Sequence, residues 1–139
     1  MTNKLFTLEE AIALLPQLRL LMERLQRHAL RLDAEMQDLA RARATSLAAL
    51  DVEELLRARP SLRLVVEELD DTVDRIGDLG GQLKDIRLCL VDFPSLLDGE
   101  RVLLCWQFGE DDIAYWHAEG EGFAGRRLLP GAAPVQRLQ

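Results

Sequence analysis

Apolar residues in the first third of the chain recur at alternating steps of three and four positions. This spacing places them on one side of an α-helix and continues over more than four heptads, which neither a strand nor a loop would show. Thr7 and Glu10 have the spacing of a capping box, and Pro16 is expected to bend the helix near its start. We therefore predict one amphipathic helix over about residues 8–41. Its apolar positions are Leu8, Ala11, Leu15, Leu18, Met22, Leu25, Ala29, Leu32, Met36 and Leu39.

A second helix with the same spacing follows a short break. Asp51 and Glu54 form another capping box, Arg59-Pro60 marks a kink, and Gly80-Gly81 ends the helix. Two long amphipathic helices joined by a short connection fold back on each other, so residues 7–80 are predicted to form an antiparallel, coiled-coil-like hairpin. The apolar positions of the second helix are Leu62, Val66, Leu69, Val73 and Ile76.

After the two glycines the pattern changes to short runs that are typical of strands. Residues 88–93, 101–108 and 113–117 are rich in aliphatic and aromatic side chains, and Asp98-Gly99 is a hairpin signal between the first two runs. We predict an antiparallel meander of three strands, or four if residues 82–85 also pair. One face of this sheet is expected to lie against the wide apolar base of the hairpin.

The predicted fold class is therefore α+β: a long antiparallel helical hairpin packed at its base on a small antiparallel β-sheet of three to four strands. We expect residues 1–139 to form a single domain. Within it, the hairpin occupies 7–80, a β-meander with a glycine-rich loop occupies 82–128, and a loosely ordered tail occupies 129–139.

Composition narrows the partners and the compartment. A formal net charge of −7 argues against a nucleic-acid partner. No apolar run reaches the roughly 20 residues that a membrane span requires, and the first residues lack the apolar segment of a secretory signal. Cys89 and Cys105 are the only cysteines, a number that suits reduced thiols in a cytoplasm. We expect a cytoplasmic protein that does not enter a membrane.

The chain's rare side chains are concentrated in residues 104–117, LCWQFGEDDIAYWH. This run holds both tryptophans, the only tyrosine, one of two cysteines and one of two histidines. Cys105 falls in the middle of a predicted strand and is expected to be buried and unreactive. The candidate ligand-binding residues, taken from this run and from the strand edges around it, are Lys84, Asp85, Asp92, Trp106, Glu110, Trp116, His117 and Arg126.

Each candidate also has a structural interpretation, which the pattern favours. The aromatic residues can form the core of the sheet. His117 can bond a neighbouring backbone group or carboxylate, and Arg126 can pair with Asp92 or Glu110 and hold the terminal loop on the sheet. His117, Asp92 and Glu110 are the candidates for a metal site, but one nearby histidine makes the signal weak. No cofactor is indicated.

Longer strings carry a resemblance to a known family. They are FTLEEAIALLPQLRLLMERL at the start, LVDFPSLLDGERVLLCWQFGEDDIAYWH later and GFAGR near the end. Over nearly its whole length the chain resembles a bacterial family known only as a domain of unknown function. The resemblance implies a fold and a bacterial source, and it implies no activity. Cys89 stands where the family usually has glycine, which leaves open whether the chain makes a tight turn there.

Two functional hypotheses follow. The first is a non-catalytic homodimeric module that binds a protein partner or a small anionic ligand, because most of the chain forms a hydrophobic stalk and no known catalytic motif is present. The alternative is a small enzyme or a metal-dependent site at the end of the sheet. Its residues would be His117, Asp92, Glu110, Lys84 and Arg126. At least three of these side chains around one pocket, with an ion or anion inside it, would favour the alternative; side chains scattered singly on the rim would count against it.

Overall fold

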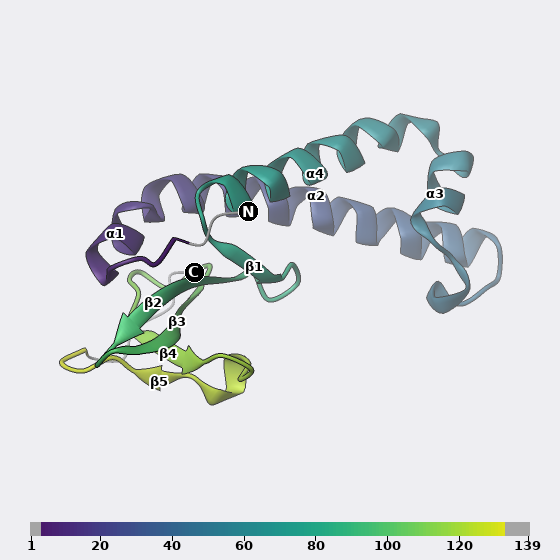
Figure 1. Cartoon of the computed structure of the whole chain (residues 1–139). Helices are drawn as coiled ribbons and strands as arrows, with labels where there is room; N and C mark the ends of the chain where they lie inside the picture. The colour runs from purple at the N-terminus through teal and green to yellow at the C-terminus, as the bar shows by residue number, and fades with distance from the viewer. Residues whose placement is uncertain (1–3, 133–139) are drawn as a thin grey trace.

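A computed structural model describes residues 4–132 of the chain. Helices come first and a β-sheet follows, so the fold class is α+β. The two long helices lie side by side, and the sheet lies at the end of the helical pair that holds the chain's N-terminal helix (Figure 1). The other end of the pair extends away from the sheet.

The first predicted helix is present but is broken once. Helix α1 spans Leu8–Ala13 and helix α2 spans Leu15–Ala42. The capping box is confirmed: the Thr7 hydroxyl accepts from the Glu10 amide at 3.1 Å, and the Glu10 carboxylate accepts from the Thr7 amide at 2.9 Å. The break falls at Leu14 because Pro16 is tolerated only in a first turn, where its missing N–H costs no helical bond.

The second helical segment is divided into short pieces before its long helix. A 3₁₀ turn η1 (Leu47–Ala49) leads into α3 (Val52–Ala58), and a second turn η2 (Pro60–Leu62) leads into α4 (Arg63–Asp78). Asp51 caps α3 by accepting from the Glu54 amide at 2.9 Å. The predicted kink is therefore where α3 ends, next to Pro60.

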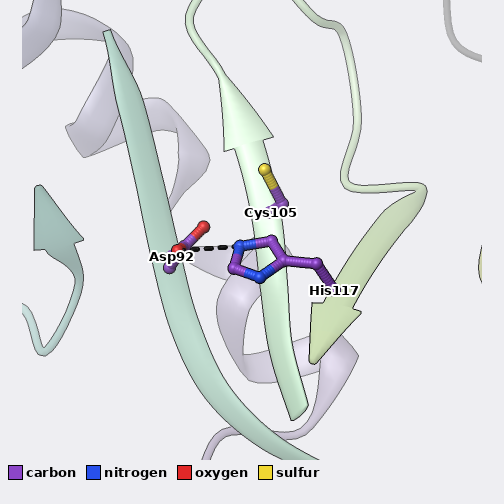
Figure 2. Close-up of side chains that lie close together, drawn as sticks. All are labelled: Asp92, Cys105 and His117. Carbon is purple, nitrogen blue, oxygen red and sulfur yellow. Dashed lines mark hydrogen bonds and ion pairs between the residues drawn. The ribbon is translucent and has the colours of Figure 1, made fainter. Parts of the chain in front are cut away.

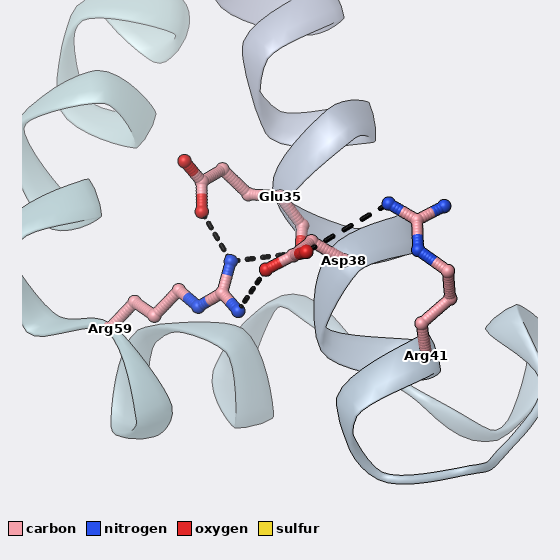
Figure 3. Close-up of polar contacts among 4 residues, drawn as sticks. All are labelled: Glu35, Asp38, Arg41 and Arg59. Atoms are coloured by element: carbon pink, nitrogen blue, oxygen red, sulfur yellow. Dashed lines mark hydrogen bonds and ion pairs between the residues drawn. The ribbon is translucent and has the colours of Figure 1, made fainter.

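An arginine at this kink holds the outer end of the hairpin together. The Arg59 guanidinium donates to the Asp38 carboxylate at 2.6 Å and to the Glu35 carboxylate, which are both on α2 (Figure 3). Arg41 adds a longer contact of 3.8 Å to Asp38. The two Arg59 ion pairs join the α3–η2 junction to α2, where a separate small core also forms. That core contains Leu39, Leu55, Leu62 and Val65.

The main core lies between the base of the hairpin and the sheet. It joins side chains of α1, α2 and α4 to alternate residues of the second and third strands. Phe6, just before α1, packs edge-to-face on Phe93 with ring centroids 5.2 Å apart. The buried apolar members include Ala11, Leu15, Leu18, Met22, Leu25, Ile76, Val91, Phe93, Leu104 and Trp106.

The sheet has five strands in the described residues, where three to four were predicted. In sequence order and in space they are β1 (Gln82–Asp85), β2 (Leu90–Leu97), β3 (Glu100–Gln107), β4 (Tyr115–Ala118) and β5 (Arg127–Leu128). All neighbours are antiparallel. The optional strand at 82–85 is present. The fifth strand corrects the prediction, because a two-residue strand has no alternation by which to recognise it.

Two local features bear on expectations from the sequence. Cys89 has a φ of +55°, in the left-handed region that favours glycine, so the chain does make a tight turn between β1 and β2. Leu129, the first residue of the predicted tail, is buried, and its amide donates to the Ala114 carbonyl at 2.8 Å. The rest of that tail beyond Ala132 lies outside the described residues.

No helix among residues 4–132 is long and apolar enough to cross a membrane.

Candidate functional site

The outer face of the sheet carries the polar side chains that the core excludes. Along β2 and β3 the residues alternate between the helices and the opposite side. Val91 and Phe93 face the helices, so Asp92 faces outward; the register then sets Cys105 of β3 opposite Asp92. His117 of β4 pairs with Leu103, two residues along from Cys105 on the same face. Three neighbouring strands thus bring three chemically active side chains together.

Asp92 and His117 form a buried pair. The imidazole extends across β3, and its Nε2 lies 2.9 Å from Asp92 Oδ2 (Figure 2). His117 Nδ1 lies 2.9 Å from the Ala118 carbonyl oxygen, which can only accept, so Nδ1 carries a proton and donates it. A second proton is then shared between Nε2 and the carboxylate. Whether it sits on the imidazole or on the carboxyl, the pair has no net charge.

The third member of the cluster is Cys105. One ligating atom from each of Asp92, Cys105 and His117 lies within 4.8 Å of the others. Their exposed fractions are 2%, 1% and 3%. Burial and the neighbouring Asp92 raise the pKa of the Cys105 thiol to about 12, so the thiol is protonated at neutral pH. Burial also raises the pKa of Asp92, and His117 and Lys84 offset part of that rise.

A cleft of about 270 Å³ opens above this cluster. Its floor is formed by side chains of the sheet, and its wall by the loop that follows β4. Lys84, exposed on the edge strand β1, stands at the rim. The residues that line the cleft are Lys84, Leu90, Asp92, Leu103, Cys105, His117, Gly120, Glu121, Gly122 and Phe123.

The loop is fixed to the sheet by Arg126. Its guanidinium makes two parallel hydrogen bonds to the buried Glu110 carboxylate, at 2.9 and 2.7 Å. It also lies 4.1 Å from the ring centroid of Tyr115 and 4.2 Å from that of Phe123. Glu110 in turn accepts from the Gln107 amide at 2.8 Å. Arg126 and Glu110 therefore bind each other, as the structural interpretation of Arg126 anticipated.

The eight candidate residues fall into three groups. Lys84, Asp92 and His117 meet at the cleft, and Glu110 and Arg126 form the pair beside it. The other three lie elsewhere. Asp85 accepts from the Leu88 amide at 2.9 Å in the turn after β1. Trp106 is fully buried in the core with its indole N–H donating to the Glu110 carbonyl, and Trp116 packs against that core from β4.

Cys105 and Phe123 are two of the seven lining residues that were not among the candidates. Cys105 was predicted to be buried and unreactive, and its burial and raised pKa agree with that, but its place beside Asp92 depends on the strand register. Phe123 belongs to the wall of the cleft and to the contact with Arg126. A short turn, η3 (Phe123–Gly125), places it there, and the glycine-rich sequence gave no sign of this turn.

The protein thus has an α+β fold in which a helical pair packs on an antiparallel meander. The polar cleft lies on the face of the sheet away from the helices. Residues 4–129 match the family described as "Uncharacterized conserved protein (DUF2203)", and the chain belongs to this family. No curated protein and no solved structure gives a significant match.

Proposed function

We propose that the protein is a non-catalytic binding module that holds a small anionic ligand in the cleft on the outer face of the sheet. The observation that carries the proposal is the unneutralised lysine at the rim of a polar cleft. In the described part of the chain Lys84 has no ion pair. An anion is the ligand that would neutralise it.

The charges around Lys84 support this choice. The Asp92–His117 pair is neutral as a unit, and the Cys105 thiol is protonated at neutral pH. Glu121, the other acidic residue of the cleft, already uses both carboxylate oxygens. One accepts from the Ala118 amide at 3.0 Å and the other contacts Arg127 at 3.2 Å. The net charge available to a ligand inside the cleft is therefore positive, although the whole chain is acidic.

The size of the cleft limits the ligand. Its volume of about 270 Å³ is near the small end of ligand pockets, which span roughly 300–1,000 Å³. A phosphate or a short dicarboxylate fits such a volume. Because the Arg126–Glu110 pair holds the wall in place, the cleft is formed before any ligand arrives.

The proposal is tested by NMR titration of the chelator-treated protein with inorganic phosphate and with succinate. We expect shifts of the backbone amides around Lys84, His117 and Gly122. Lys84→Gln should weaken binding about tenfold or more, since a hydrogen bond to a charged group contributes about 1.5–3 kcal/mol. Lys4, the only other lysine, pairs with Glu10 at 3.3 Å and does not line the cleft, so Lys4→Gln is the matched control. Titrations that leave the cleft amides unmoved would contradict the proposal.

The proposal also includes a homodimer in the cytoplasm. Large apolar side chains on the helices remain outside both cores, among them Leu20 (69% exposed), Leu30 (62%) and Leu64 (62%). A second copy packed along the hairpin would cover such residues. Both cysteines are free, which suits a reducing compartment. The number of subunits in a native mass spectrum decides between monomer and dimer.

A further inference from the structure

We propose that Asp92, Cys105 and His117 form a binding site for Zn²⁺, with a fourth coordination position directed to the cleft. The inference names a component of the same cleft and therefore builds on the proposed function, but it makes a separate claim about the three side chains on the floor. None of the arguments below requires the anionic ligand.

The donor set has the composition of a zinc site. It offers one carboxylate oxygen, one sulfur and one imidazole nitrogen, all within 4.8 Å of one another. Zinc binds these donors at about 2.0–2.3 Å, so tetrahedral neighbours lie about 3.5 Å apart. In the cluster, His117 Nε2 and Asp92 Oδ2 are 2.9 Å apart and the three ligating atoms all lie within 4.8 Å of one another, so the spacing of a zinc site lies between these two distances. A thiolate together with an imidazole selects a transition metal over Mg²⁺ or Ca²⁺, which prefer oxygen donors alone.

One buried polar atom of this cluster lacks a hydrogen-bond partner among the described residues. Asp92 Oδ1 is buried and, within the described residues, has no hydrogen-bond partner. A buried acceptor left unpaired costs about 1–3 kcal/mol, more when the group is charged, and such groups are rare in folded proteins. Its side chain lines the cleft, next to a protonated thiol. A cation held between the carboxylate and the sulfur would complete the coordination of both.

His117 is already oriented as metal-binding histidines are. Its Nδ1 donates to the Ala118 carbonyl, which fixes the ring and leaves Nε2 directed at the cluster. Histidine ligands almost always donate their other ring N–H in this way, to a carbonyl or carboxylate. The three ligands also come from paired strands rather than from loops, so their relative positions are set by the sheet.

The fourth coordination position of the zinc would open toward the rim of the cleft. Three protein ligands leave one tetrahedral position for water or for an anion. Zn²⁺ binding would displace the Cys105 thiol proton and the proton shared by Asp92 and His117, and both would pass to solvent. The dication with one carboxylate, one thiolate and a neutral imidazole then has no net charge, so Lys84 at the rim still favours an anion. The zinc would thus sit at the floor, and the small ligand of the proposed function would approach it from the rim.

The test is a titration of the reduced, chelator-treated full-length protein with Co²⁺, which replaces Zn²⁺ with visible spectral bands. We expect one equivalent to bind with intense d–d bands of tetrahedral cobalt and a sulfur-to-cobalt charge-transfer band. Cys105→Ser should abolish the charge-transfer band. His117→Gln should weaken binding at least about 100-fold, beyond the 10–100-fold typical when the lost residue only hydrogen-bonds a metal ligand. Cys89→Ser, at the chain's other buried cysteine, should change neither.

A measurement on the unaltered protein guards against variants that fail to fold. X-ray absorption at the zinc edge should show one sulfur at about 2.3 Å. Absence of a charge-transfer band, a band that survives Cys105→Ser, or a zinc shell of oxygen alone would overturn the inference. Phosphate binding to the metal-free protein without cobalt binding would reject the zinc site and keep the proposed function. Cobalt binding without phosphate binding would reject the proposed anion site and keep the zinc site.

Discussion

At the scale of single residues, the polar groups on the outer face of the sheet are buried as deeply as the apolar ones on the inner face. Asp92, Cys105 and His117 are each almost inaccessible, yet they lie against a cleft rather than inside the main core. Burial of this kind disfavours charge, which is why the pKa values of Asp92 and Cys105 are both raised. These residues therefore shape how the protein responds to pH.

Because the pKa of the Cys105 thiol is raised, we predict that the protein loses stability in alkali. Its pKa is about 12 in the folded chain, against 9.0 for an unperturbed thiol. Between these values the unfolded chain binds fewer protons than the folded one, so the free energy of unfolding falls as pH rises from 9. Below pH 9 this contribution is fully present. Urea unfolding of the chelator-treated protein should show the fall, and Cys105→Ala should make it shallower. Parallel curves for the two proteins would contradict the assignment.

The identity of the site was only partly predictable at this scale. Lys84, Asp92 and His117 were found because charged residues and histidine at strand edges are unusual enough to notice. Cys105 was not, since a cysteine between leucine and tryptophan in a strand has the pattern of an ordinary core residue. Its proximity to Asp92 is a property of the β2–β3 register, which no spacing along one strand reveals.

At the scale of elements, the long helices were predictable and the small connections were not. Helix α2 repeats its apolar spacing over many turns, and so many apolar positions with one period predict a helix strongly. Strand β5 has two residues, and η3 has three, and segments so short carry no period. Tertiary contacts define them: β5 pairs with β4, and η3 is held by the contact of Arg126 with Glu110, Tyr115 and Phe123. This contact decides whether the cleft has a wall.

Removing that contact should destabilise the sheet end of the molecule. The side chains of Arg126 and Glu110 are 15% and 2% exposed, so Arg126→Ala leaves a carboxylate buried without its partner. We expect a loss of about 3 kcal/mol in the free energy of unfolding. The neighbouring Arg127 makes an exposed ion pair with Glu121, and Arg127→Ala should cost less than about 1 kcal/mol.

Hydrogen exchange separates this local effect from general destabilisation. In the Arg126→Ala protein the amides of residues 119–126 should exchange faster than those of α2, because the loop opens without unfolding the helices. Equal losses of stability in the two arginine variants, or uniform exchange over the whole chain, would show that the pair does not hold the loop.

At the scale of the whole molecule, the helical pair and the cleft occupy opposite faces of the sheet. The helices bury the inner face, and the loop after β4 partly covers the outer one. The sequence predicted that the sheet would lie at the base of the hairpin, because the apolar stripe widens only there. It placed one face of the sheet on the helices; the other face is also largely buried, where Leu103 and Cys105 of β3 lie below the loop after β4. The sheet thus separates the helical pair from the cleft.

The central claim is that Asp92, Cys105 and His117, at the floor of the cleft, form a zinc site rather than part of a second core. Native mass spectrometry of protein purified without chelator tests it most directly. The account predicts that each subunit is heavier than its sequence by one zinc ion, with or without a small anion, and that His117→Gln returns it to the bare mass. Bare subunits in the unaltered protein, or an added mass that His117→Gln leaves in place, would contradict the claim.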